Sequence, residues 1–271
     1  MKSVDFLKEK GVDVEKSLEL FGDMDTYNST IGEFILGATS KLPKLEEYKN
    51  DKDMNNYAIY AHSLKSDAKY FGFTKLAELA YNQEMKSKEG DVYYIYDTYD
   101  DLVNETNRLI HVVKQYLGEE PSDEEPKSIS ITPILEEQRE VYQEPTILVA
   151  DDSNIVRNFV SRIFSGTYKV GVAKDGEEAL AIIKANQTND NLKAILLDLN
   201  MPEVDGFAVL DYMKSQKLFT QLPVSIISGD SSKETIDRAF TYQIVDMIKK
   251  PFNDKDIKMV IEKTIYFKEM N

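Results

Sequence analysis

The chain has 271 residues, a hydrophobic content of 42% and a formal net charge of −15. This excess of negative charge argues against nucleic-acid binding, because phosphate contacts need clustered Lys and Arg. The absence of cysteine excludes disulfides and thiolate metal sites. No apolar run approaches the ~18–20 residues that cross a bilayer, and we find no signal peptide at the N-terminus. We therefore expect a cytoplasmic protein of two domains, with neither a membrane nor a nucleic acid as partner.

Residues 1–117 predict an all-helical domain. The string "DMNNYAIYAHSLKSDAKYF" places Tyr57, Ala61, Leu64 and Ala68 on one stripe at helical spacing, and the neighbouring strings keep the same period. A helix over residues 26–49 should be kinked at Pro43. Four or more amphipathic helices with short polar connections favour an antiparallel bundle.

Residues 118–144 differ in composition from both flanks. They contain nine acidic and two basic side chains, together with several prolines. Such a segment predicts an extended, self-repelling linker, within which Pro133–Tyr142 could form a short helix.

Residues 145–271 predict a different architecture, in which short apolar runs alternate with amphipathic stretches. The expected strands are Ile147–Ala150, Tyr168–Val172, Ala194–Leu197, Val224–Ile227 and Ile244–Ile248. This alternation predicts an α/β doubly wound fold with a five-stranded parallel sheet, whose ligands bind beyond the carboxyl ends of the strands. The segment contains neither GxGxxG nor a P-loop, so a nucleotide site is not indicated.

Polar residues close four of these runs. They are Asp151 and Asp152 in "TILVADDS", Asp198 in "KAILLDLNMPEVDG", Ser228 in "VSIISGD" and Lys250 in "DMIKKPF". Neighbouring carboxylates repel one another, and a hard cation such as Mg²⁺ resolves the conflict. Asp198 can then act as an oxygen nucleophile toward phosphorus, while Lys250 and Ser228 bind the phosphoryl oxygens. The simpler alternative for any one of these residues is a helix cap, as Asp152 or Ser153 could provide.

These four motifs, in this order and at these intervals, closely resemble the receiver domain of two-component response regulators over about residues 145–268. The resemblance implies a flavodoxin-like fold. It also implies that the receiver domain catalyses its own phosphorylation and dephosphorylation. It implies the following roles: Asp198 as phospho-acceptor, Asp151, Asp152, Asp198 and the backbone carbonyl of Asn200 as Mg²⁺ ligands, and Ser228 and Lys250 as contacts of the phosphoryl group.

Two positions bear on how the resemblance is read. Pro251 follows the lysine, where a cis peptide bond is common in the family. Met247 stands three residues before the lysine, where the family usually has an aromatic switch residue. We therefore expect phosphorylation to change the surface of the domain more weakly, or at a different place, than in family members with the aromatic residue.

The chain contains two histidines, His62 and His111. Helical spacing puts His62 on a polar face with Lys65, Ser66 and Lys69, which predicts a solvated imidazole beside ammonium groups. His111 also falls on a polar face, so periodicity alone does not separate the two, and either could be an ordinary surface histidine.

The surrounding string distinguishes the two histidines. "YAHSLKSDAKYFGFTKLAELAYNQE" resembles the active helix and the following helix of histidine-phosphotransfer (HPt) domains, and the resemblance covers about residues 4–117. It implies that His62 accepts a phosphoryl group and that Lys65 is its electrostatic partner. Ser66 replaces the usual glycine one turn after the histidine.

Together, these features predict a phosphorelay protein made of an HPt bundle (1–117), an acidic linker (118–144) and a receiver (145–271). Nothing in the sequence resembles a kinase ATP-binding domain, so we expect phosphoryl groups to come from a separate histidine kinase or another phosphorelay protein. Two alternatives remain. An aspartyl-phosphate phosphatase would usually carry a second aspartate where this chain has Asn200. A non-catalytic signalling scaffold predicts a broken acceptor set, yet every receiver ligand is present.

Overall fold

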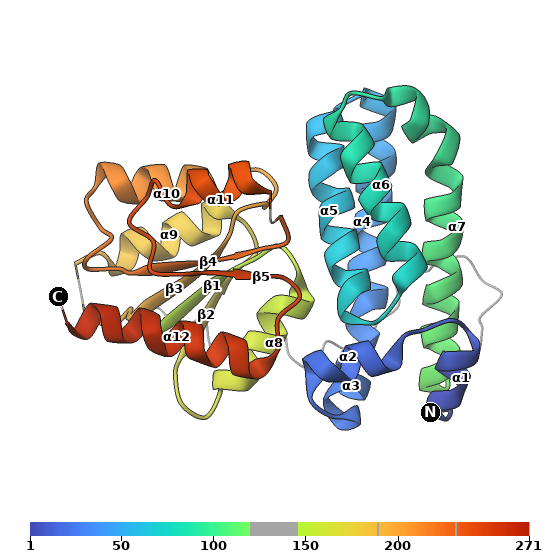
Figure 1. The fold of residues 1–271 in the computed structure, drawn as a ribbon, viewed down its shortest axis with the longest axis horizontal. Helices are drawn as coiled ribbons and strands as arrows, with labels where there is room; N and C mark the ends of the chain where they lie inside the picture. Colours follow the sequence, from blue (N-terminus) through green and yellow to red (C-terminus); the bar gives the residue numbers. More distant parts are fainter. Residues whose placement is uncertain (120–145, 189, 231, 271) are drawn as a thin grey trace.

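The computed structural model describes residues 1–119, 146–188, 190–230 and 232–270 (Figure 1). We call residues 1–119 the helical part and residues 146–270 the α/β part. Most of the predicted linker, including the possible helix over Pro133–Tyr142, lies outside the described residues. Among the described helices, none is both long and apolar enough to span a membrane.

Four long helices of the helical part form an antiparallel bundle, as predicted (Figure 1). They are α4 (Gly32–Asp51), α5 (Met54–Tyr70), α6 (Thr74–Lys88) and α7 (Val92–Leu117). The connections are so short that each helix must reverse direction against its predecessor. Asp53 and Asp91 begin α5 and α7 by accepting backbone N–H groups at the first turn, which supplies partners that the helix itself lacks.

Three short helices precede the bundle and cover one end of it. They are α1 (Val4–Glu9), α2 (Val14–Phe21) and α3 (Met24–Thr30). The predicted helix over residues 26–49 is in fact two, since α3 ends at Thr30 and α4 begins at Gly32. α4 continues through Pro43, because Ala38 and Leu45 on either side of the proline are buried in the bundle core.

The α/β part contains the predicted five-stranded parallel sheet, with strand order β2-β1-β3-β4-β5. The strands are β1 (Ile147–Ala150), β2 (Val170–Ala173), β3 (Ala194–Asp198), β4 (Val224–Ser228) and β5 (Met247–Lys249). The edge strand β5 is shorter than predicted. Its pairing with β4 starts at Met247, opposite Ile226.

Helices cover both faces of this sheet (Figure 1). One face carries α8 (Asn154–Phe164) and α12 (Asp254–Glu269), and the other carries α9 (Gly176–Asn186), α10 (Gly206–Ser215) and α11 (Lys233–Ala239). Each face buries its own apolar cluster. Since β1, β3 and β4 lie between the two layers, their side chains are buried throughout.

The apolar cluster beneath α8 and α12 is continuous with the core of the helical bundle. The Phe21 and Phe159 ring centroids lie 5.7 Å apart, and those of Tyr70 and Phe252 lie 6.1 Å apart. Polar contacts flank these rings: the Ser153 hydroxyl donates to a carboxylate oxygen of Asp67 at 2.7 Å. The two parts are therefore docked through a shared aromatic core.

We expect Tyr70→Ala to lower the free energy of unfolding of the full chain by about 3–5 kcal/mol, the usual cost of truncating a buried aromatic ring. Tyr70 is fully buried and touches rings from both parts. Urea denaturation followed by circular dichroism measures the effect. Tyr81→Ala is the control, because Tyr81 is 48% exposed on the next helix, and an equal loss in both variants would contradict the shared core.

Candidate functional site

The carboxyl ends of the parallel strands bring the predicted receiver residues to one edge of the sheet. Asp151 follows β1, Asp198 ends β3, Ser228 ends β4 and Lys250 follows β5. The chain turns back closely after β3, where a Cβ atom on Gly206 would lie 2.2 Å from the carbonyl oxygen of Asp198. A glycine is therefore required to begin α10 at this point without displacing the end of β3.

Three carboxylates gather at this edge. Ligand oxygens of Asp151, Asp152 and Asp198 all lie within 4.8 Å of one another. Lys250 is buried with them, and its Nζ lies 2.6 Å from Asp151 Oδ2 and 2.5 Å from Asp198 Oδ2. One ammonium thus contacts two of the three carboxylates, Asp151 and Asp198.

Burial and charge act in opposite directions on these groups. Burial raises the pKa of the Asp151 carboxyl, the positive charge of Lys250 lowers it, and the neighbouring Asp198 and Asp152 raise it again, so that the pKa stays above its usual range. Burial lowers the pKa of Lys250, but Asp151 and Asp198 outweigh this effect and keep the ammonium charged. The lysine therefore holds the carboxylates together.

The donors present fit a hard divalent cation such as Mg²⁺, which prefers oxygen ligands. Asp151 Oδ2 accepts no hydrogen bond of good geometry, although it lies near the Lys250 ammonium. Asp198 Oδ1 accepts only the backbone N–H of Asn200, at 3.1 Å, among the contacts of this oxygen that the structure describes. The residues that would hold the cation are Asp151, Asp152, Asp198 and, through its carbonyl, Asn200.

Ser228 also faces this edge with a hydroxyl that retains donor capacity. Its Oγ accepts the backbone N–H of Asp230 at 3.1 Å, and its proton stays available to a second partner. The backbone N–H of Lys250 donates to the Ser228 carbonyl at 2.8 Å, which fixes the two residues side by side. The Lys250–Pro251 peptide bond is cis.

The prediction of a solvated His62 is wrong. Only 3% of the residue is exposed, and Lys65 and Ser66 on the same face are nearly as buried. This face of α5 is polar, as the helical spacing predicted, but the α/β part packs over it. His111, by contrast, is exposed on α7, where its ring contacts Gln115 at 2.8 Å.

Glu84 of α6 is the main partner of His62. Its Oε1 lies 2.9 Å from His62 Nδ1, and its Oε2 accepts from Lys65 Nζ at 2.6 Å. Lys88 Nζ donates to Oε1 at 2.7 Å. Burial would raise the pKa of Glu84, but hydrogen bonding and the charges of His62 and Lys65 hold it well below its usual range.

This network fixes the state of the imidazole. Lys65 Nζ also lies 3.1 Å from Nδ1, but an ammonium only donates and an ionised carboxylate only accepts. Since Lys65 has its closer partner in Glu84, we assign the Nδ1 proton to the bond with Glu84. His62 Nε2, which has no hydrogen-bond partner among the described residues, then carries a free lone pair.

Sequence reasoning missed Glu84. A signal was present, because Leu76, Ala80, Gln83, Glu84 and Ser87 share the buried stripe of α6. An acid on a buried stripe of a helix needs a buried partner of opposite charge. The resemblance to HPt domains did not by itself indicate this partner of His62.

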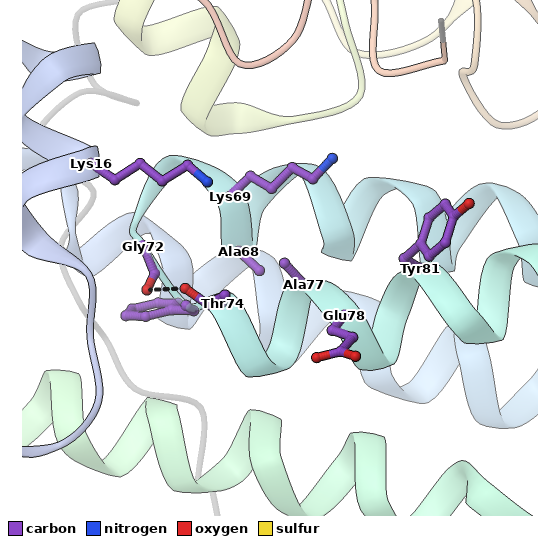
Figure 2. Close-up of a pocket in the computed structure, with 9 residues that line it drawn as sticks. Lys16, Ala68, Lys69, Gly72, Thr74, Ala77, Glu78 and Tyr81 are labelled. Atoms are coloured by element: carbon purple, nitrogen blue, oxygen red, sulfur yellow. Dashed lines mark hydrogen bonds between the residues drawn. The ribbon is translucent and has the colours of Figure 1, made fainter. Parts of the chain in front are cut away.

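A hollow of about 220 Å³ lies between α2, α5 and α6, away from the carboxylate cluster (Figure 2). Ala68 and Ala77 form its floor, and Lys16 and Lys69 lie along one rim. Burial lowers the pKa of Lys69, and the charges of Lys65 and Lys249 lower it further. None of the predicted acceptor or metal residues lines this hollow, so we assign it no role.

Comparison with known proteins identifies the class of the α/β part. Residues 147–262 match the family model described as the response regulator receiver domain. The two-component response regulator ORR3 of Oryza sativa is 29% identical over 123 residues, which are 45% of this chain and 92% of that protein. The probable methanogenesis regulatory protein FilR2 of Methanothrix harundinacea is 26% identical over 121 residues, 43% of this chain and 78% of that protein.

A solved structure gives a similar match. The receiver domain of the Francisella response regulator 1452 is 30% identical, with a TM-score of 0.40, and the match covers 47% of this chain and 99% of that domain. Residues 147–262 thus form a response regulator receiver domain, the type of module used in two-component signalling.

We expect Lys250→Met to lower the free energy of unfolding by about 3–5 kcal/mol in the absence of divalent cations, because it leaves buried carboxylates without their counter-charge. Added Mg²⁺ should then raise the melting temperature of the variant more than that of the wild type. Lys249→Met is the matched control, since Lys249 is exposed. An equal Mg²⁺ response in all three proteins would argue against a cation among these carboxylates.

Glu84→Gln should destabilise the chain most near neutral pH, by about 3–5 kcal/mol, because Lys65 loses its buried partner. The folded-state pKa of Glu84 lies below its ordinary value of 4.5. Its stabilisation is therefore present above pH 4.5 and is lost as the pH falls toward the folded-state pKa. The difference from wild type in urea unfolding should narrow below pH 4.5. Glu78→Gln, an exposed acid on the same helix, should show no such dependence.

Proposed function

We propose that this chain is a phosphorelay signalling protein that accepts phosphoryl groups on Asp198 and on His62. It would exchange them with a histidine kinase or other phosphorelay proteins. One observation carries the proposal: three carboxylates, an ammonium and a hydroxyl converge at one edge of a receiver sheet. In this proposal residues 1–117 are an HPt bundle, 118–144 a linker and 145–271 the receiver.

Asp198 is the proposed nucleophile. Its Oδ2 lies 2.5 Å from Lys250 Nζ, and Oδ1 is oriented by the backbone N–H of Asn200. An oxygen of this carboxylate attacks phosphorus, a P–O bond forms to Asp198, and the bond to the donor's leaving group breaks. Bound Mg²⁺ would neutralise the carboxylates and the phosphoryl oxygens during this step.

Lys250 and Ser228 are the proposed phosphoryl contacts. Lys250 would give up one carboxylate contact and bind a phosphoryl oxygen instead. The reason is that negative charge moves from the Asp198 carboxylate to the new acyl phosphate. Ser228 would donate its free hydroxyl proton to another oxygen. Both groups are held rigidly, since each is buried at the end of a sheet strand.

His62 is the proposed second acceptor. Its support is the bare Nε2 and the carboxylate at Nδ1, a pairing that keeps the imidazole in a nucleophilic tautomer. Lys65 would act as electrostatic partner, as the resemblance to HPt domains implies, but through Glu84, to which it is bonded.

The two alternative functions receive less support. An aspartyl-phosphate phosphatase needs an acid/base group two residues after the nucleophile, and Asn200 cannot serve as one. A scaffold without chemistry would have no need to bury two carboxylates and a lysine together beside a third carboxylate, an arrangement that costs desolvation energy.

Incubation with acetyl phosphate and Mg²⁺ tests the proposal. We expect wild type to gain a phosphoryl group by intact mass, and Asp198→Asn to gain none from this small donor. His62→Gln should still be labelled on Asp198. Alkali distinguishes the two products, because phosphohistidine survives it and an acyl phosphate does not. Labelling of Asp198→Asn to the wild-type level would contradict the assignment of the acceptor.

A further inference from the structure

One face of α5 lies across the carboxyl edge of the receiver sheet. Three residues of this helix, spaced five and three positions apart, touch three different loops of the α/β part. His62 meets Gly229 after β4, Asp67 meets Ser153 after β1, and Tyr70 meets Phe252 after β5. The helix that carries His62 is thus docked on the loops that carry the acceptor site.

Two loops that flank Asp198 enclose the His62 imidazole. On one side is Gly229, the residue after Ser228. On the other is Asn200, whose backbone N–H binds Asp198. His62, Lys88 and Asn200 line a common pocket of about 130 Å³. The imidazole therefore approaches the acceptor site from within the same chain.

The contact with Gly229 is close. A Cβ atom on this residue would lie 2.5 Å from His62 Nε2 and 2.8 Å from its Cε1. Any larger side chain must push the imidazole away from the edge of the sheet. The nitrogen concerned is the one that lacks a hydrogen-bond partner.

Both groups are buried in the docked arrangement. Asp198 has no exposed surface and His62 only 3%. In this arrangement each group lies beside the other's loops, whereas exchange with a second protein requires the two parts to separate.

We propose that His62 and Asp198 exchange a phosphoryl group within one chain in this docked arrangement, and that Gly229 determines whether the imidazole can reach the site. The inference rests on the proposed function of both residues. It adds that the exchange is intramolecular and names the residue that permits it.

In the transfer from the receiver, the lone pair on Nε2 attacks phosphorus of the Asp198 acyl phosphate. The N–P bond forms, the P–O bond to Asp198 breaks, and Asp198 leaves with the bonding electrons as a carboxylate. Nδ1 keeps the proton that it donates to Glu84, whose negative charge balances the phosphoimidazole cation. The reverse transfer follows the same path, with an Asp198 oxygen as nucleophile.

Dilution is the first test. Full-length wild type is labelled with acetyl phosphate and Mg²⁺, freed of donor, and sampled for alkali-stable phosphohistidine. Linked sites have an effective concentration on the order of millimolar, so the first-order rate of transfer should not change over about a hundredfold dilution. In a mixture of Asp198→Asn and labelled His62→Gln chains, transfer should be at least about tenfold slower at the same low concentration.

Gly229→Leu is the second test. We expect Asp198 to be labelled as fast as in wild type or faster, since docking is weakened, while phosphohistidine falls at least about tenfold relative to wild type. Gly166→Ala is the control, because a Cβ atom there meets open space. Gly229→Ala, a smaller change, should give an intermediate loss, and it replaces the leucine variant if that variant does not fold.

The outcomes separate this inference from the proposed function. Transfer that slows with dilution, or that is as fast in the mixture as in wild type, overturns the intramolecular exchange and leaves both acceptors in place. Labelled Asp198 with no phosphohistidine under any condition overturns it as well, and removes His62 from the relay. No label on Asp198 in wild type means that the proposed function itself fails.

Discussion

The Lys250 ammonium lies between two buried carboxylates that would otherwise repel each other, and the geometry of the receiver edge depends on this contact. Asp151 and Asp198 belong to neighbouring strands, and Lys250 reaches both from the far side of β4. The helical part has a similar arrangement with the charges reversed, in which the Glu84 carboxylate lies between the ammonium groups of Lys65 and Lys88. In both places a buried charge is tolerated because a buried counter-charge, Lys250 in one and Lys65 in the other, forms a hydrogen bond with it.

The receiver site could be predicted from the sequence because its geometry follows from local pattern. Parallel strands end at one edge, so residues that close apolar runs must meet there, as Asp151, Asp198 and Lys250 do. The surroundings of His62 could not be predicted in the same way. Helical spacing showed correctly that its face is polar, but whether water or another part of the chain covers a polar face is decided by contacts between residues far apart in sequence. Glu84 was missed for the same reason.

α5 has to satisfy two sets of contacts at once. One side, with Tyr57, Ala61 and Leu64, belongs to the bundle core, while the other meets the loops of the receiver. Nearly every position from Tyr57 onward is therefore buried, which explains why the helix contains small and polar residues where an isolated bundle would expose long charged ones. The same two sets of contacts explain why position 66 holds a small residue, because the Ser66 hydroxyl lies 3.1 Å from the position of a Cβ atom on Gly229.

The shared aromatic core has a consequence for how the two parts behave when they are separated. Phe21 and Tyr70 on one side and Phe159 and Phe252 on the other are nearly inaccessible to water and lie against one another. A fragment ending before the α/β part, or one beginning with it, would present a contiguous apolar patch of the kind that promotes self-association. Each half is therefore expected to be less soluble alone than within the intact chain, in which the two surfaces protect each other.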